Sequence, residues 1–337
     1  MKELIRQLVE AYGPSGHEGQ IRALIEEQVA PHVDDVRTDA MGNLIALKRG
    51  RPEGGGGGKS VMVAAHMDEI GLVVTYIDEK GFLRFAPTGG VSPMTLVGSR
   101  VRFANGASGV IGWEKWMRPE GATSRPDLSE LYIDVGATSR DDAPVGVGDA
   151  AGFVRPFEDL GQRLIAKSMD NRISCAVAMQ ALFDLGDSPN DLYFCFTAQE
   201  EVGTRGAVTA SYGIDPDLGL AVDVTLVGDT PKARPMAVSL GEGPAIKIMD
   251  SGMLAHPGVV RWMMETADAL GIPYQREVLQ GGSTDARSIQ LSRAGVPSGC
   301  LSIPCRYVHT PSEMVDYGDV QQAVSLLVEL LGQEIAL

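Results

Sequence analysis

The chain changes its hydrophobic pattern twice, and this change constrains the fold more than any other feature. Before residue 70 and after about residue 163, segments with helical spacing alternate with short apolar runs. Residues 70–162 contain only short runs rich in valine, isoleucine and aromatic residues, separated by glycine and proline. The first pattern is typical of an α/β domain and the second of a small barrel or sandwich. We therefore predict an α/β domain formed by residues 1–69 and 163–337, with an all-β, barrel-like domain inserted at 70–162.

Individual helices and strands are predicted on both sides of the insertion. Five consecutive glycines at 54–58 predict a surface loop. Helical spacing predicts helices at 1–12, 19–30, 170–185, 257–270 and 320–331, and continuous apolar runs predict strands at 60–65, 191–197, 218–222 and 296–303.

The charge balance excludes several classes of partner. The chain carries 29 lysine and arginine residues against 44 aspartate and glutamate residues, a net charge of −15. Such an acidic surface repels the phosphates of nucleic acids and of anionic membranes. Residues 1–12 have charged interruptions instead of a signal-peptide core, and no apolar run approaches the ~18 residues of a membrane helix. We expect a cytoplasmic protein that binds neither nucleic acid nor membrane.

The four cysteines agree with this location. They form no C-x-x-C pair, and Cys175 and Cys195 lie inside apolar runs. Such positions favour buried free thiols over disulfides, and free thiols are typical of a reducing compartment.

Two of the five histidines follow apolar runs that we interpret as strands. His66 comes directly after the run at 60–65, and His309 lies shortly after the run at 296–303. Residues two apart on an extended chain face the same side, so Asp68 is able to accept the spare proton of His66 and aim its other nitrogen at a metal. Taken alone, His66 is equally compatible with a strand-end histidine capped by Asp68, and His309 with a loop histidine.

Acidic residues stand at similar positions. Glu200 and Glu201 directly follow the strand expected at 191–197. Asp223 stands where another apolar run stops, and Asp170 opens an expected helix. Adjacent residues point in different directions, so one glutamate is able to ligate a metal while its neighbour acts as base on a bound water. Each acid also has an ordinary interpretation, the glutamates as solvated loop acids and Asp170 as a helix N-cap.

Together these residues predict a metal site. Strand ends and helix starts form the edge where open α/β sheets bind ligands. Histidine and carboxylate ligands without cysteine suit zinc, cobalt or manganese, and two metals that share one bridging carboxylate need two histidines, the bridge and two further acids. The chain supplies that set. It has no H-E-x-x-H motif, which excludes a thermolysin-like helical site, and we interpret Glu313, four residues after His309, as structural.

The order His-x-Asp, Asp-Asn, Glu-Glu, Asp, His resembles that of the co-catalytic di-zinc exopeptidases. The amino-acid sequences of several segments are similar to those of the tetrahedral (TET) aminopeptidases. This group contains deblocking, glutamyl and leucyl aminopeptidases and members once labelled endoglucanases. The resemblance covers nearly the whole chain, although Ser283 is an extra residue relative to the usual Gly-Gly-Thr-Asp. It rests on residues 14–18 (PSGHE), 65–71 (AHMDEIG), 168–172 (SMDNR), 198–203 (AQEEVG), 281–286 (GGSTDA) and 309–313 (HTPSE).

The resemblance implies two divalent metal ions per subunit, with zinc as the expected metal and cobalt or manganese as alternatives. It implies that His66 and Asp223 hold one ion and that Glu201 and His309 hold the other. Asp170 would bridge the two ions.

The resemblance also implies catalytic and substrate-binding residues. Glu200 would be the general base, and Asp68 would orient the ring of His66. Gly281, Gly282 and Thr284 in the late segment are candidates for contact with substrate.

The resemblance further implies a fold, a substrate and an assembly. The α/β part would be a mixed-sheet di-zinc exopeptidase domain, and the insertion would support dimers that commonly assemble into a hollow dodecamer. The substrates would be peptides with a free N-terminus, cleaved one residue at a time by water attack at the dinuclear site.

Other functions stay open at this point. The same set of residues is compatible with an amidase or deacetylase of the same clan that acts on small N-acyl substrates. An endoglucanase would use two carboxylates, and the two histidines have no natural place in that chemistry. A third alternative is an assembly or binding protein that has the same fold and no catalytic activity. The presence of every acid and histidine of these segments argues against it, because such a protein would not need them all.

Overall fold

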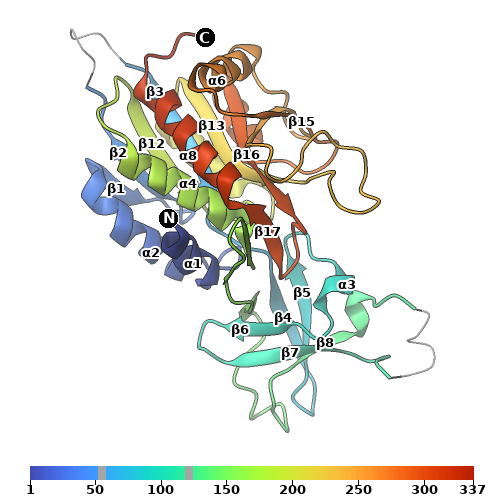
Figure 1. Cartoon of the computed structure of the whole chain (residues 1–337). Coiled ribbons are helices and arrows are strands. Elements are labelled where there is room, and N and C mark those ends of the chain that lie inside the picture. Colours follow the sequence, from blue (N-terminus) through green and yellow to red (C-terminus); the bar gives the residue numbers. More distant parts are fainter. Residues whose placement is uncertain (52–57, 118–123) are drawn as a thin grey trace.

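The computed structural model describes residues 1–51, 58–117 and 124–337 and contains two bodies of regular structure (Figure 1). One is an α/β domain around a mixed sheet of 11 strands, and the other is a closed barrel of β-strands. The prediction of an α/β domain with a barrel-like insertion is confirmed. The glycine loop predicted at 54–58 falls, except for its last residue, outside the described residues.

The centre of the sheet is parallel and its borders are antiparallel. The strand order is β1-β2-β12-β3-β13-β16-β17-β11-β10, and β14 pairs with both β16 and β15. β12, β3, β13 and β16 run parallel to one another. The strands are β1 (Asp35–Thr38), β2 (Leu44–Lys48), β3 (Ser60–His66), β10 (Glu158–Asp159), β11 (Arg163–Ala166), β12 (Asp191–Thr197), β13 (Leu218–Thr225), β14 (Ala245–Met249), β15 (Gln275–Val278), β16 (Ser298–Arg306) and β17 (Glu313–Asp316).

Helices cover both faces of this sheet. On one face α4 and α8 lie across the central strands, with α6 beside them (Figure 1), and α5 and α7 pack against the other face. The α-helices of the described residues are α1 (Lys2–Glu10), α2 (Gly19–Val29), α3 (Pro93–Leu96), α4 (Met169–Asp184), α5 (Arg205–Ile214), α6 (Pro257–Leu270), α7 (Asp285–Gln290) and α8 (Tyr317–Gly332).

The central strand β3 is buried on both faces. Val61, Val63 and Ala65 belong to the large core beneath α4 and α8. Met62 and Ala64 point the other way, into the smaller core beneath α5 and α7. This explains why the segment is a continuous apolar run, as parallel strands between two helical layers usually are.

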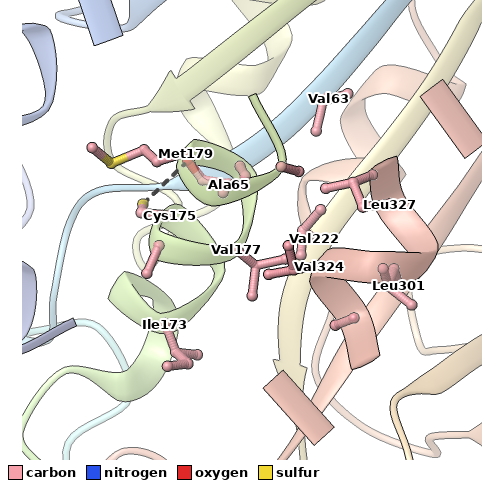
Figure 2. Close-up of a cluster of buried hydrophobic side chains, with 14 of the residues drawn as sticks. Val63, Ala65, Ile173, Cys175, Val177, Met179, Val222, Leu301, Val324 and Leu327 are labelled. Carbon is pink, nitrogen blue, oxygen red and sulfur yellow. Dashed lines mark hydrogen bonds between the residues drawn. The ribbon is translucent and has the colours of Figure 1, made fainter. Parts of the chain in front are cut away.

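The large core is where α4 and α8 meet the sheet. Figure 2 shows Val177 of α4 beside Val222 of β13 and Val324 of α8, with Leu327 of α8 and Leu301 of β16 close by. All five side chains are buried. This packing holds α4, and therefore the residues at its start, against the middle of the sheet.

The carboxyl ends of the parallel strands meet at one edge. Thr197, the last residue of β12, is paired in register with His66, the last residue of β3. On the other side of β3, Ala221 of β13 is paired with Ala64. Because the register is fixed, residues that lie far apart in the sequence are carried to the same edge.

The barrel closes on itself and lies at one end of the α/β domain (Figure 1). It has its own core of apolar side chains, which include Leu72, Phe103, Ile111 and Ile133. Its strands follow the order β4-β5-β8-β7-β6-β9 and are β4 (Gly71–Ile77), β5 (Leu83–Thr88), β6 (Arg100–Phe103), β7 (Ser108–Trp113), β8 (Leu131–Asp134) and β9 (Ala150–Phe153).

The structure differs from the sequence-based expectations at two places near the sheet edge. Asp223 lies within β13 instead of after it, because Val224 and Thr225 continue the strand and the Thr225 hydroxyl is satisfied by Glu277. Asp170 stands in the first turn of α4 but has non-helical backbone angles (φ −76°, ψ 103°). It is therefore not a simple N-cap of a regular helix.

Two further expectations have an outcome. Cys175 and Cys195 are buried and free, as predicted, and Cys300 and Cys305 are buried and free as well. Within the described ranges, no helix is both long and apolar enough to span a bilayer.

We predict that Leu327→Ala destabilises the α/β domain by about 2–5 kcal/mol, because Leu327 is fully buried between α8 and the sheet and its loss leaves a cavity. Urea unfolding followed by circular dichroism at the helical band measures the change. The control is Leu160→Ala, at a position that is 58% exposed, for which we expect a change within about 0.5 kcal/mol. Equal unfolding midpoints for the two variants would contradict this description of the core.

Candidate metal centre

Five side chains that the sequence singled out converge at the carboxyl edge of the sheet. His66 ends β3, Asp223 lies near the end of β13, and Asp170 stands at the start of α4. Glu201 follows β12, and His309 lies in the connection between β16 and β17. The parallel register of the central strands and the packing of α4 bring these side chains together.

Asp170 lies between the two histidines. Its Oδ1 is 3.1 Å from Nε2 of His66, and its Oδ2 is 3.3 Å from Nε2 of His309. The side chain of Asp170 is 8% exposed, so both oxygens are directed into the protein and toward the two rings. One carboxylate is therefore positioned to serve two neighbouring sites.

The five residues form two groups that share Asp170. In the first, ligand atoms of His66, Asp170 and Asp223 all lie within 4.8 Å of one another. In the second, the same holds for Asp170, Glu201 and His309, and Oε2 of Glu201 is 3.2 Å from Nε2 of His309. Each group offers imidazole nitrogen and carboxylate oxygen, the donor set that zinc, cobalt and manganese accept.

Asp68 holds the loop that carries the two glutamates. Its Oδ1 accepts a hydrogen bond from the amide of Glu200 (2.9 Å), and its Oδ2 accepts bonds from the amide of Glu201 (3.1 Å) and the hydroxyl of Ser15 (2.6 Å). Nδ1 of His66 is 3.1 Å from the carbonyl oxygen of Asp68 and 3.5 Å from its carboxylate. The hydrogen bond to the ring therefore involves the backbone carbonyl of Asp68 and not the carboxylate that was expected to accept the proton, and the carboxylate makes its shorter contacts with the glutamate loop and Ser15.

Glu313 connects the backbones of two candidate ligands. Its Oε1 accepts the amide hydrogen of His309, and its Oε2 accepts that of Asp170, both at 2.8 Å. Glu313 is 1% exposed and lies in β17. Its expected structural character is confirmed by these contacts, which fix the spacing between a loop residue and the start of α4.

The acids and histidines perturb one another strongly. Burial alone would lower the pKa of His66, but Glu200 and Asp170 raise it well above the ordinary value. Burial also opposes the charged form of His309, and Asp170 and Glu201 raise its pKa to about 12. For Asp170, burial raises the pKa, but the two histidines outweigh this effect and lower it.

For the remaining carboxylates the histidines offset the effect of burial only in part. Burial raises the pKa of Glu200 and Asp223 well above their usual values, and each is further raised by acidic neighbours. Burial and Asp170 raise the pKa of Glu201 in the same way. Buried acids this close together disfavour each other's charge unless a positive group stands between them.

The residues present fit divalent cations at both groups. Oε1 of Glu201 is buried and has no hydrogen-bond partner within the described part of the chain. Cysteine is absent from both groups, and all their ligand atoms are imidazole nitrogens or carboxylate oxygens. A free acceptor among buried acids is what a bound cation would satisfy.

A cavity of about 550 Å³ opens beside the two groups. His66, Glu200 and His309 line it, and so do Gly281 and Gly282. The cavity also includes Thr284, so all three substrate-contact candidates of the late segment stand beside the ligand cluster.

Sequence reasoning missed one buried acid of this region. Asp285 is 1% exposed and accepts a hydrogen bond from the hydroxyl of Thr197 at the end of β12. Burial raises its pKa to about 6, with His66 and Thr197 opposing the rise. Its position directly after Thr284 in the late segment could have drawn attention to it. Only the contact between α7 and the end of β12 shows that this acid lies at the site.

The barrel also reaches the site, which no local sequence pattern indicates. A Cβ built on Gly90, in the segment after β5, would stand 2.5 Å from Nδ1 of His309. At Gly89, which has a φ of +85°, it would stand 3.0 Å from Oε2 of Glu201. Two glycines therefore let the barrel backbone pass close to one candidate metal group.

Comparison with known sequences finds the same family along most of the chain. A model of the M42 glutamyl aminopeptidase family matches residues 42–326. A putative aminopeptidase of Acetivibrio thermocellus is 46% identical over 333 residues, which cover 98% of each chain. A lysyl aminopeptidase of Pyrococcus furiosus is 35% identical over 341 residues, 98% of this chain and 96% of that one.

Solved structures are similar over the whole fold. An aminopeptidase of the archaeon Desulfurococcus kamchatkensis has a TM-score of 0.93 and 41% identity and covers 98% of this chain and 94% of its own. The TET1 peptidase of Pyrococcus horikoshii, described as assembling into a tetrahedron or a large octahedral shell, has a TM-score of 0.89 and 31% identity, with 98% and 99% covered. A Thermotoga maritima protein described as an endoglucanase has a TM-score of 0.81 and 33% identity, with 97% and 96% covered.

We predict that Gly90→Ala weakens metal binding at the His309 group by roughly 10- to 100-fold, because the added methyl forces the His309 ring to move. Competition with a chromophoric chelator measures the affinity. The control is Gly146→Ala in the same domain, where the new Cβ meets nothing closer than 3.9 Å. Equal metal affinity in the two variants would show that the close approach of the barrel is without consequence.

Proposed function

The chain belongs to the M42 glutamyl aminopeptidase family, and from that premise we propose how its residues release the N-terminal residue of a peptide at a dinuclear metal site. The observation that carries the proposal is the position of Asp170, whose two oxygens face two different histidines. A carboxylate that faces two imidazoles is suited to bridge a pair of neighbouring cations.

In this proposal His66 and Asp223 hold one ion, Glu201 and His309 hold the other, and Asp170 bridges them. Zinc is the metal that we expect, and the same donors accept cobalt or manganese. When bound, the ions supply Lewis acidity, which lowers the pKa of a bound water and polarises the scissile carbonyl.

Glu200 is the proposed general base. It lines the cavity, and its Oε2 lies 3.7 Å from Nε2 of His66, beside the ligand cluster without belonging to either group. Its raised pKa suits a group that takes a proton from water and then gives it to the leaving amine. Asp68 fixes the backbone of Glu200 and so sets where that carboxylate stands.

A free N-terminus is the proposed recognition feature of the substrate. Glu200 lines the cavity and belongs to neither metal group, so its carboxylate is available to attract an α-ammonium group. N-acyl substrates of an amidase or deacetylase lack that charge. We propose that Gly281, Gly282 and Thr284, which lie in the connection between β15 and α7, contact the substrate, since all three line the same cavity.

An endoglucanase activity would need two carboxylates that act as acid and base on a glycosidic bond. In this chain the acids of the site stand in groups with His66 and His309. This arrangement favours peptide hydrolysis and gives the histidines a use that glycoside hydrolysis lacks.

We predict that Glu200→Gln lowers kcat on aminoacyl reporter substrates by about 100- to 10,000-fold, since the amide no longer accepts the proton of water. Elemental analysis should still find two metal ions per chain, because neither proposed ligand group includes Glu200. The control is Glu27→Gln, an exposed position on α2, for which activity and metal content should not change. Full activity of Glu200→Gln would refute its role as base, and activity of the parent protein that withstands metal removal would refute the metal site.

We propose that the inserted domain, residues 70–162, serves dimerisation and that dimers assemble further into a dodecamer. The barrel exposes several large apolar side chains, among them Trp116 (61% exposed) and Met94 (60% exposed). Trp116 lines one hollow with Val110 and Tyr132, and exposed apolar side chains that lie together mark interaction surfaces. The four free cysteines support a reducing, cytoplasmic location.

Light scattering after size-exclusion chromatography tests the assembly. We expect a mass of twelve times the 35.8 kDa of one chain, and Trp116→Asp should shift the population toward smaller species because it places a charge in the apolar surface. A parent protein that elutes as a monomer would contradict the proposal.

A further inference from the structure

The turn at residues 14–18 contains a buried acid that the proposed mechanism does not use. Glu18 is 4% exposed, and no cationic side chain of the described residues forms an ion pair with it. A carboxylate that is removed from water costs free energy unless other groups satisfy its charge. The contacts of Glu18 therefore indicate what it does.

Two backbone amides share one oxygen of Glu18. Its Oε1 accepts a hydrogen bond from the amide of Gly16 in the same turn (2.7 Å). The same oxygen also accepts one from the amide of Gln199 (3.1 Å), 181 positions further along the chain. Gln199 directly precedes Glu200, so this second bond joins the N-terminal turn to the loop that carries the proposed base.

Gln199 has a backbone conformation that needs such support. Its φ is +56°, in the left-handed region that residues other than glycine adopt rarely. Conformations of this kind persist where the surrounding structure holds them. Because Gln199 stands next to Glu200, its backbone angles decide in which direction the chain presents the Glu200 side chain.

The residues around Gln199 are held in the same manner. The amide of Ala198 donates to Oδ1 of Asn43 (2.9 Å), and the amides of the two residues after Gln199 donate to the carboxylate of Asp68. Together with the bond to Glu18, four consecutive amides donate to buried side chains. The shape of this loop is therefore set by side chains from other segments, and Glu18 is the one that the N-terminal turn supplies.

The N-terminal turn itself has a fixed position. Arg172 is fully buried near the start of α4. Its guanidinium donates hydrogen bonds to the backbone carbonyls of Leu8, Gly13 and Met67. These contacts join the last turn of α1, the residue before the N-terminal turn and the segment after β3. Glu18 therefore projects from a rigid support.

We propose that Glu18 is a positioning residue, which holds Gln199 in its left-handed conformation and so keeps the Glu200 carboxylate at the place where the reaction needs it. This inference rests on the proposed function, in which Glu200 is the general base. Glu18 does not line the cavity and acts only through the loop. A displacement of about 1 Å at a reacting group is enough to lower a rate by about 100-fold.

Replacement of Glu18 by alanine tests the proposal on aminoacyl reporter substrates. We expect Glu18→Ala to lower kcat by roughly 10- to 100-fold, with KM and metal content unchanged. Glu18→Gln keeps an oxygen acceptor at the same place, and it should retain kcat within about threefold. The control is Glu26→Ala, at an exposed position of α2, which should change neither kcat nor KM.

Glu18→Asp separates geometry from charge, and it takes the place of the alanine variant if that variant does not fold. It keeps the carboxylate and withdraws its oxygens by one methylene, whereas Glu18→Gln loses the charge and keeps the reach. We expect a lower kcat for Glu18→Asp than for Glu18→Gln. The opposite order overturns the proposal, because the charge and not the position of the acceptor would then matter.

The variant Glu200→Gln shows whether Glu18 acts through the base. In that background, addition of Glu18→Ala should lower the residual kcat by no more than about threefold, because no base is left to position. A loss as large as the one that Glu18→Ala causes in the parent enzyme overturns the inference.

The outcomes distinguish this inference from the proposed function. Equal kcat of the parent and Glu18→Ala, or a loss confined to KM or to metal content, overturns the inference alone. Full activity of Glu200→Gln, or failure of the parent to hydrolyse any aminoacyl reporter with metal present, overturns the proposed function and the inference with it.

Discussion

The mutual repulsion of buried carboxylates is the constraint on which the rest of this structure depends. Asp170, Glu201 and Asp223 are each almost inaccessible to water, and burial disfavours the charge of every one of them. Two histidines compensate only in part, which is visible in their raised pKa values. Such a cluster is stable when cations occupy it, and so the fold around it has to hold acids in place against their own repulsion.

That restraint comes from backbone hydrogen bonds to other carboxylates. Asp68 accepts the amides of Glu200 and Glu201, and Glu313 accepts those of His309 and Asp170. Asp68 therefore fixes two adjacent residues of one loop, whereas Glu313 fixes two site residues that belong to different segments of the chain. These four bonds use the backbone amides of the site residues and not their side chains. The carboxylates and the imidazole therefore stay available as ligands or as a base.

The two domains share the site more closely than their separate cores suggest. The barrel has its own hydrophobic cluster, yet Gly90 passes directly against His309. On the opposite side, α7 and the loop before it bring Thr284 and Arg287 into the cavity. The candidate metal ligands thus come from the sheet edge and α4, while the remaining lining of the cavity comes from loops, and the inserted domain approaches one candidate group.

The amino-acid sequence alone was sufficient to predict the α/β domain, the β-insertion and the five acids and histidines that converge at the sheet edge. These features are visible in the local sequence, because an apolar run that ends at His66 or shortly before Glu200 indicates the end of a strand independently of the rest of the chain. Only the tertiary structure decided that Asp170 faces two histidines, that Asp223 lies within a strand, and that Asp285, Gly90 and Arg287 stand at the site. Those relations depend on strand register and on the packing of α4 and α7, which join residues far apart in the sequence and leave no local periodic signal.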